Sequence, residues 1–82
     1  MNYRATVRVA LKDGVLDPEA RTIEHSLGRL GFEVSEMQRA EEYDFVLDAA
    51  DEAEARDTAE EMCERLLANP VIHDYTVEVT EA

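Results

Sequence analysis

The chain has 82 residues, of which 45% are hydrophobic and 34% are charged. This length suits one small folded domain and excludes a large catalytic cleft, because a chain of this size buries only about 60 to 65% of its unfolded surface. Twenty acidic residues against eight basic ones give a net charge of −12. A negative field repels phosphate backbones and anionic lipids, so we expect neither nucleic acid nor a membrane among the partners.

The acidic residues are spread along the whole sequence, and Lys12 is the only lysine. One interpretation is a solvated surface that keeps a small protein soluble. The other is adaptation to high salt, in which counterions screen the repulsion within a dense layer of carboxylates. The second interpretation predicts a stability that rises steeply with KCl.

The first third of the sequence predicts a strand followed by a helix. Apolar residues alternate from Tyr3 to Leu11, which is typical of a half-buried strand. Asp17 and Pro18 predict a helix start, because Asp accepts free amide hydrogens there and Pro loses no hydrogen bond. Gly31 ends this helix. The apolar stripe of the helix consists of Ala20, Ile23, Leu27 and Leu30.

The remaining sequence predicts two strands, a long helix and a last strand. A strand begins at Phe32 and weakens toward Arg39, and the connection 38–42 joins it to a strand over residues 43–48. A helix then runs from Asp51 until Asn69 and Pro70 stop it, and residues 75–80 alternate as a final strand. The apolar stripe of the second helix consists of Ala55, Ala59, Met62, Cys63 and Leu66.

The order β-α-β-β-α-β predicts an α+β fold, a single two-layer domain over residues 1–82. We expect a ferredoxin-like, four-stranded antiparallel sheet with both helices on one face. The other face would then be open, and it is the first candidate for a partner interface. Its alternative is a solvated face with cross-strand ion pairs worth roughly 0.2 to 1 kcal/mol each. The residues of this open face are Arg4, Thr6, Arg8, Asp44, Val46, Thr76 and Glu78.

The sequence contains no catalytic, cofactor-binding or metal-binding motif. Cys63 has no partner cysteine and lies on the apolar stripe of the second helix, which favours packing over nucleophilic chemistry. His73 beside Asp74 is a weak candidate for proton transfer, and a loop histidine without a special role is the favoured interpretation. No apolar segment is long enough to span a membrane, and the N-terminus has no signal-peptide core; we therefore expect a cytoplasmic protein.

Two blocks of sequence resemble the PurS family, the small subunit of phosphoribosylformylglycinamidine synthase in purine biosynthesis. The first contains LKDGVLDP at residues 11–18 and continues to the Leu30-Gly31-Phe32 segment, and the second contains LLANPVI at residues 66–72. The resemblance extends through essentially the whole chain. It departs from the family pattern at Gln38, Ala40 and Glu41, where the family has cationic and glycine positions, so the contacts of this segment are expected to differ.

The resemblance implies a non-catalytic subunit in a complex that converts formylglycinamide ribonucleotide, glutamine and ATP to formylglycinamidine ribonucleotide. It implies three partners: a second copy in a homodimer or homotetramer, a large synthetase subunit of the PurL type and a glutaminase subunit of the PurQ type. It also implies that ATP and Mg bind to the synthetase, with no cofactor in this chain. The candidate interface residues are Arg4, Arg8, Arg39, Asn69, Pro70 and His73.

Two other functions are compatible with the residues. A stand-alone small-molecule-sensing domain of the ferredoxin-like kind would bind a ligand where two sheets join, although no sequence feature specifies that ligand. A small enzyme acting through His73 and Asp74 is the weaker alternative, and it predicts that replacing His73 by Ala abolishes activity.

Overall fold

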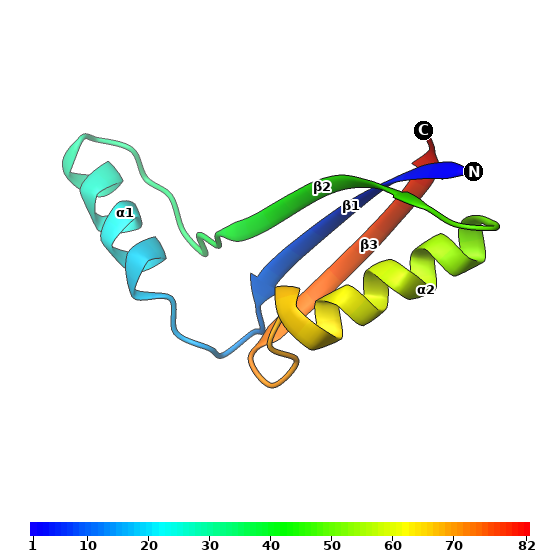
Figure 1. Ribbon diagram of the computed structural model, residues 1–82. Helices are drawn as coiled ribbons and strands as arrows, with labels where there is room; N and C mark the ends of the chain where they lie inside the picture. Colours follow the sequence, from blue (N-terminus) through cyan, green and yellow to red (C-terminus); the bar gives the residue numbers. More distant parts are fainter.

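The computed structural model describes residues 1–82 and contains a three-stranded antiparallel sheet with the strand order β2-β1-β3. The strands span Asn2–Leu11 (β1), Ala40–Asp48 (β2) and His73–Glu81 (β3). The central strand β1 pairs along nearly its whole length with both neighbours. Each outer strand therefore keeps one free edge (Figure 1).

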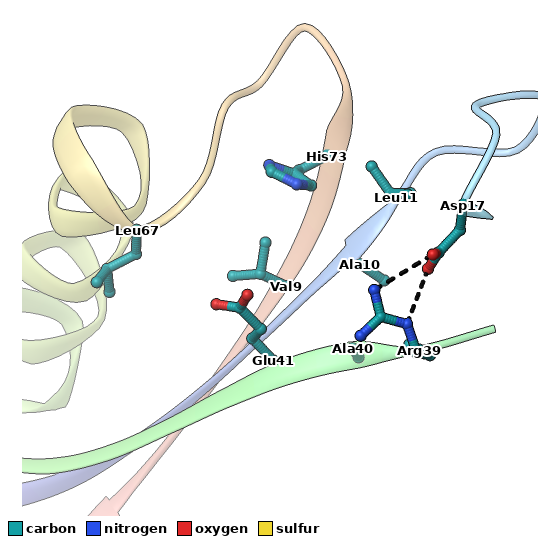
Figure 2. A pocket seen from close by; sticks show the side chains of 9 residues that line it. All are labelled: Val9, Ala10, Leu11, Asp17, Arg39, Ala40, Glu41, Leu67 and His73. Atoms are coloured by element: carbon teal, nitrogen blue, oxygen red, sulfur yellow. Dashed lines mark hydrogen bonds and ion pairs between the residues drawn. The ribbon is translucent and has the colours of Figure 1, made fainter. Parts of the chain in front are cut away.

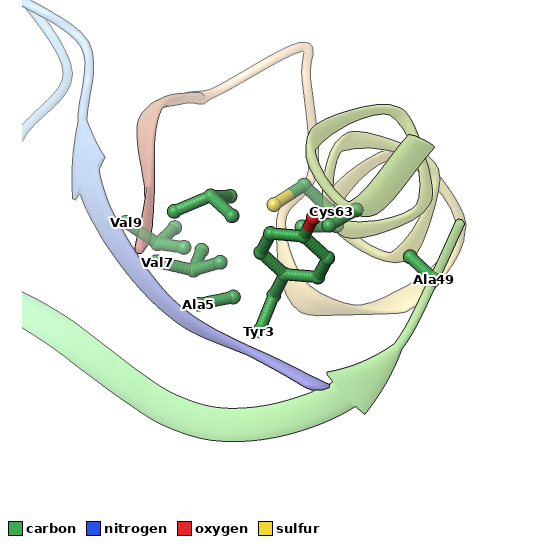
Figure 3. Close-up of a cluster of buried hydrophobic side chains, with 9 residues drawn as sticks. Tyr3, Ala5, Val7, Val9, Ala49 and Cys63 are labelled. Carbon is green, nitrogen blue, oxygen red and sulfur yellow. The ribbon is translucent and has the colours of Figure 1, made fainter. Parts of the chain in front are cut away.

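One helix covers part of this sheet. Helix α2 spans Glu52–Met62 and continues into a π-helical turn, η1, over Cys63–Leu67. It packs against β3 and β1, and we call this side of the sheet the helix-side face. Every second side chain of β1 points to it, as the pleat of a strand requires. The buried core (Figure 3) consists of Tyr3, Ala5, Val7, Val9, Ala49, Ala55, Ala59, Cys63 and Val79.

The other helix, α1, spans Pro18–Arg29 and stands away from the sheet (Figure 1). We call residues 12–39 the arm, and residues 1–11 and 40–82 the body. The Cα radius of gyration is 16.2 Å, whereas a compact chain of this length has about 12 Å. The chain is therefore elongated, with extents of 51 × 26 × 14 Å.

The predicted limits of α1 are confirmed. The Asp17 carboxylate accepts the backbone N–H of Ala20 at 3.0 Å. At the other end Gly31 has φ +97°, a left-handed conformation that suits glycine. The N–H groups of Gly31 and Phe32 donate to the carbonyls of Gly28 and Leu27 at 3.1 and 2.9 Å, which closes the helix in a Schellman motif.

The α+β class and the antiparallel ferredoxin-like sheet are confirmed, but two details of the expected architecture are wrong. The sheet has three strands instead of four, and only α2 packs on it. The segment expected to form a strand from Phe32 is a loop, and Glu36 at φ 55° interrupts the extended backbone there. The next strand begins at Ala40, inside the expected connection. The apolar alternation that begins at Phe32 therefore belongs to the arm and not to the sheet.

Candidate functional site

A groove opens on the helix-side face, between the end of η1 and the base of the arm (Figure 2). Its volume is about 180 Å³, and side chains from all three strands, η1 and the arm form its walls. Two of the predicted interface residues, Arg39 and His73, lie here. The lining residues are Val9, Ala10, Leu11, Asp17, Arg39, Ala40, Glu41, Leu67 and His73.

An ion pair between Asp17 and Arg39 fixes the base of the arm. The Nε and Nη2 atoms of Arg39 each lie 3.2 Å from an oxygen of Asp17, a two-pronged arrangement that gives geometric specificity. Nη1 of Arg39 lies 3.1 Å from Oε2 of Glu19. One carboxylate therefore caps α1 and also holds the residue that precedes β2.

Hydrogen bonding keeps both members of this pair charged. The pKa of Asp17 lies below its ordinary value because hydrogen bonds stabilise the carboxylate form. The largest contribution comes from the Ala20 amide, and the next comes from the Arg39 guanidinium. The bond to Asp17 in turn raises the pKa of Arg39. Sequence reasoning identified Asp17 as a helix cap but missed its pairing with Arg39. No local pattern could reveal it, since the two residues are 22 positions apart.

Asn69, Pro70 and His73 form a closed loop at the same end of the sheet. Nδ1 of His73 accepts the backbone N–H of Asn69 at 2.9 Å, and Oδ1 of Asn69 accepts the N–H of Val71 at 3.0 Å. The Asn69 carbonyl also accepts the amide hydrogens of Ile72 and His73. A neutral His73 then carries its proton on Nε2, so the ring acts as a structural acceptor in this loop.

Arg4 and Arg8 lie on the opposite, open face. Their partners across the sheet are Val46 and Thr80 for Arg4, and Glu42 and Thr76 for Arg8. Between them Oγ1 of Thr6 donates to the Asp44 carboxylate at 2.7 Å. Both arginines are exposed, and neither is within ion-pair distance of a carboxylate. The predicted open face is thus confirmed, and it presents free guanidinium groups.

Two exposed apolar side chains beside the closed loop were not predicted as surface features. Leu66 is 84% exposed and Val71 is 81% exposed. The sequence placed Leu66 on the buried stripe of the second helix, which is wrong. The turn η1 contains a bond from the Ala68 amide to the Cys63 carbonyl, and this wider turn changes the register, so Leu67 packs against the core instead.

The core holds the one cysteine. Cys63 is fully buried, and burial raises the pKa of its thiol, which disfavours the reactive thiolate. His, Cys, Asp and Glu side chains form no group of three that could hold a metal ion. No helix has the length and apolar character required to cross a bilayer.

These features define a class of protein: a small acidic α+β domain of ferredoxin-like type, with an open sheet face, free strand edges and a projecting helix. The model of the PurS family, phosphoribosylformylglycinamidine (FGAM) synthase, matches residues 4–81. The PurS subunit of phosphoribosylformylglycinamidine synthase from Methanocaldococcus jannaschii is 49% identical over 94% of each chain. The chain belongs to the PurS family, and it is a subunit of phosphoribosylformylglycinamidine synthase in purine biosynthesis.

Solved structures extend the likeness to the whole fold. The crystal structure of Methanocaldococcus jannaschii PurS matches with a TM-score of 0.86 and 47% identity, over 98% of each chain. A chain in the PurLQS structure from Thermotoga maritima matches with a TM-score of 0.89 and 26% identity, over 98% of this chain and 99% of that one. The matched residues therefore include the arm as well as the body.

Proposed function

We propose that this chain is a non-catalytic assembly subunit of phosphoribosylformylglycinamidine synthase, which joins a PurQ-type glutaminase to a PurL-type synthetase. The observation that carries the proposal is the likeness, over 98% of the chain, to a component of the PurLQS structure. The proposal includes self-association as a homodimer or homotetramer. ATP and Mg would bind to the synthetase, and the complex would act in the cytoplasm.

The physical role of such a subunit is to raise the effective concentration of one enzyme near another. Ammonia that escapes into water at neutral pH becomes ammonium, which has no lone pair for attack on the amide carbon of the substrate. Holding the glutaminase beside the synthetase shortens the path of ammonia and increases its capture. This role requires surfaces rather than catalytic residues. It is consistent with the buried thiol of Cys63 and the structural bond of His73.

The alternative of a stand-alone small-molecule sensor is not favoured. Family membership assigns the chain to an enzyme complex and not to a stand-alone regulatory domain.

Reconstitution tests the proposal. The synthetase and the glutaminase are assayed with FGAR, ATP and Mg, with and without this chain, using either glutamine or ammonium as the nitrogen source. Omitting the chain should abolish glutamine-dependent product formation and leave ammonium-dependent turnover of the synthetase intact. Equal glutamine-dependent turnover without the chain would refute the assembly role. Turnover by the isolated chain, abolished in His73→Ala, would instead support the enzymatic alternative.

The candidate interface residues form two groups that separate variants can test. Arg4 and Arg8 lie on the open face, whereas Arg39, Asn69, Pro70 and His73 lie at the arm end of the sheet. We expect Arg4→Ala/Arg8→Ala to weaken capture by the partner subunits about tenfold, because exposed guanidinium groups without an ion pair are free for a carboxylate of the partner.

The matched control for the two arginines is Arg65→Ala on helical turn η1, whose guanidinium already pairs with Glu61 at 3.4 Å. Binding is measured by titration of the labelled chain with the assembled partners. If the double variant and the control bind the partners with equal affinity, the open face does not take part in the interface.

A further inference from the structure

An imidazole ring closes the loop of residues 69–73, between η1 and β3. The backbone N–H of His73 donates to the carbonyl of Asn69 at 2.8 Å. The backbone N–H of Asn69 in turn donates to Nδ1 of His73 at 2.9 Å. A ring nitrogen accepts a hydrogen bond only while it carries no hydrogen itself. The second of these two bonds therefore requires a neutral His73.

The other polar groups of this loop are already bonded. Oδ1 of Asn69 accepts the N–H of Val71 at 3.0 Å, and the Ile72 carbonyl accepts the N–H of Lys12 at 2.8 Å. When His73 is protonated, Nδ1 carries a hydrogen that faces the hydrogen of the Asn69 amide. Two donors cannot bond to each other, so this exposed amide takes water as its partner instead.

The groove of Figure 2 offers a second position to the charged ring. His73 lines this groove from β3, and Glu41 lines it from β2. The other carboxylate of the groove, Asp17, is held by Arg39. Glu41 has no cation within ion-pair distance and accepts the hydroxyl group of Tyr43. An imidazolium that turns into the groove thus meets a carboxylate with which it forms a charge-assisted hydrogen bond.

The charges around His73 are mostly negative. The charged and titratable groups there are Asp17, Arg39 and Glu41 in the groove, Glu64 on η1, Lys12 after β1, and Asp74 and Tyr75 on β3. Four of them are carboxylates, and of the two cations Arg39 is paired with Asp17. On a chain with a net charge of −12, an added positive charge is therefore attracted to this place and not repelled from it.

We propose that His73 is a pH-sensitive switch: the neutral ring holds the loop 69–73 closed, and the protonated ring releases the Asn69 amide and turns toward Glu41. Histidine changes its charge between about pH 8 and pH 5, so the closed loop is lost as the pH falls through this range. Opening displaces the tip of the loop, where Val71 is 81% exposed. Asn69 and Pro70 are candidate interface residues, so acid would also alter the surface offered to the partner subunits. Only this last consequence rests on the proposed function.

NMR of the full chain labelled with nitrogen-15 tests the switch directly. An N–H···N hydrogen bond transmits a scalar coupling between its two nitrogen nuclei, so a coupling between the Asn69 amide and Nδ1 of His73 reports this bond. We expect the coupling at about pH 8 and its loss at about pH 5. A coupling that persists at the lower pH, or that is absent at the higher pH, overturns the proposal.

Hydrogen exchange with His73→Asn separates protonation of the ring from other effects of acid. The side-chain oxygen of asparagine can accept the same hydrogen bond, but it does not titrate. In the wild type the protection of the Asn69 amide, corrected for the intrinsic exchange rate, should fall about tenfold as the pH is lowered. In His73→Asn it should stay constant.

The matched control is His25→Asn, which replaces the only other histidine, at an exposed position of α1. This variant should lose the protection of Asn69 as the wild type does. Equal pH dependence in His73→Asn and the wild type would show that His73 is not the switch.

Glu41→Gln tests the second position of the ring. Without the carboxylate the charged ring loses its partner in the groove, so the loop should open at a lower pH than in the wild type. An unchanged midpoint of opening would contradict the two-position switch. The Ala49 amide donates to the Met1 carbonyl at 2.9 Å in the body and should stay protected throughout. A parallel loss at Ala49 would indicate general unfolding by acid and would refute a local switch.

These measurements include no partner subunit. Their failure is therefore distinguishable from a failure of the assembly role, which glutamine-dependent turnover reports.

Discussion

At the scale of single residues, Cys63 connects packing with the absence of thiol chemistry. The side chain is fully buried and belongs to the same core cluster as Val7. Its pKa is raised first by desolvation and then by the nearby Glu60 and Glu64. The sequence predicted this core position from helical spacing alone. The prediction was possible because Cys63 lies four residues after Ala59, on the same helical stripe.

We expect Cys63 to be inert toward a thiol reagent in the folded protein and to react fully in urea. Cys63→Ser should lower the free energy of unfolding by about 1 to 3 kcal/mol, because it buries a hydroxyl group without a partner. Cys63→Ala is the control that removes the sulfur without adding a polar group. Neither variant should alter glutamine-dependent turnover when the complex is folded, and a loss of turnover in Cys63→Ala would assign the thiol a chemical role.

The carboxylate of Asp17 gives the arm a pH-dependent stability. Its pKa in the folded state is lower than its ordinary value of 3.8, so its contribution is fully present above the pKa of the unfolded chain. That contribution is lost as the pH falls through the lower, folded-state pKa. Asp17→Asn keeps an acceptor for the cap but removes this titration.

Urea unfolding of both proteins between about pH 7 and pH 2 measures the effect. The stability difference between wild type and Asp17→Asn should shrink as the pH falls. A difference that stays constant over the whole range would show that the charge of Asp17 contributes nothing to stability.

At the scale of elements, the two ends of α1 were predictable and its surroundings were not. The ends of the helix depend on local backbone geometry at Asp17, Pro18 and Gly31. These residue types indicate that geometry directly from the sequence. The apolar stripe of α1 must pack against another surface, but the spacing of its residues does not identify that surface. The prediction of a fourth strand was wrong for a related reason, because the apolar alternation that begins at Phe32 is equally compatible with an exposed arm.

Two glycines near the end of α1 should respond in opposite ways to the same substitution. Gly31→Ala should destabilise the helix by about 1 kcal/mol, because alanine disfavours φ +97°. Gly28→Ala should stabilise it by about 0.4 to 1 kcal/mol, because Gly28 is helical and an added Cβ would meet nothing within 4 Å. Hydrogen exchange of the Leu30 amide reports both changes, and equal effects of the two variants would contradict this account of the helix end.

In the second helix, helical spacing predicts burial correctly for only part of the apolar stripe. Ala55, Ala59 and Cys63 are buried as predicted, but the wider turn of η1 brings Leu67 toward the core and leaves Leu66 in water. A π-helical turn changes the register of every residue after it. The prediction of burial therefore holds for Ala55, Ala59 and Cys63. It is wrong for Met62, which is 36% exposed just before the turn, and for Leu66 within the turn.

At the scale of the whole molecule, net charge dominates the expected response to salt. A charge of −12 on 82 residues destabilises the folded state through self-repulsion, and salt screens this repulsion. We expect the midpoint of thermal unfolding to rise by about 5 °C or more between low salt and 2 M KCl, since about 1 kcal/mol shifts a domain of this size by 4 to 8 °C. Protein concentration must stay fixed, because self-association also changes the midpoint.

The control for this effect is Glu60→Gln/Glu78→Gln, which removes two exposed carboxylates from the body. Its unfolding midpoint should depend less on KCl than that of the wild type. Equal salt dependence in both proteins, or complete stability without salt, would mean that repulsion between carboxylates is not what limits the fold.

The two chain ends meet at the end of the sheet farthest from the arm (Figure 1). The N-terminal ammonium group lies 3.0 Å from the Asp48 carboxylate, and the amide of Ala82 donates to the Asn2 carbonyl at 3.0 Å. A short peptide could thus close the backbone into a ring, or splice the whole unit into a loop of another polypeptide, without reaching α1. Affinity tags and fluorophores attached at either terminus would likewise leave the helix free to engage whatever it packs against.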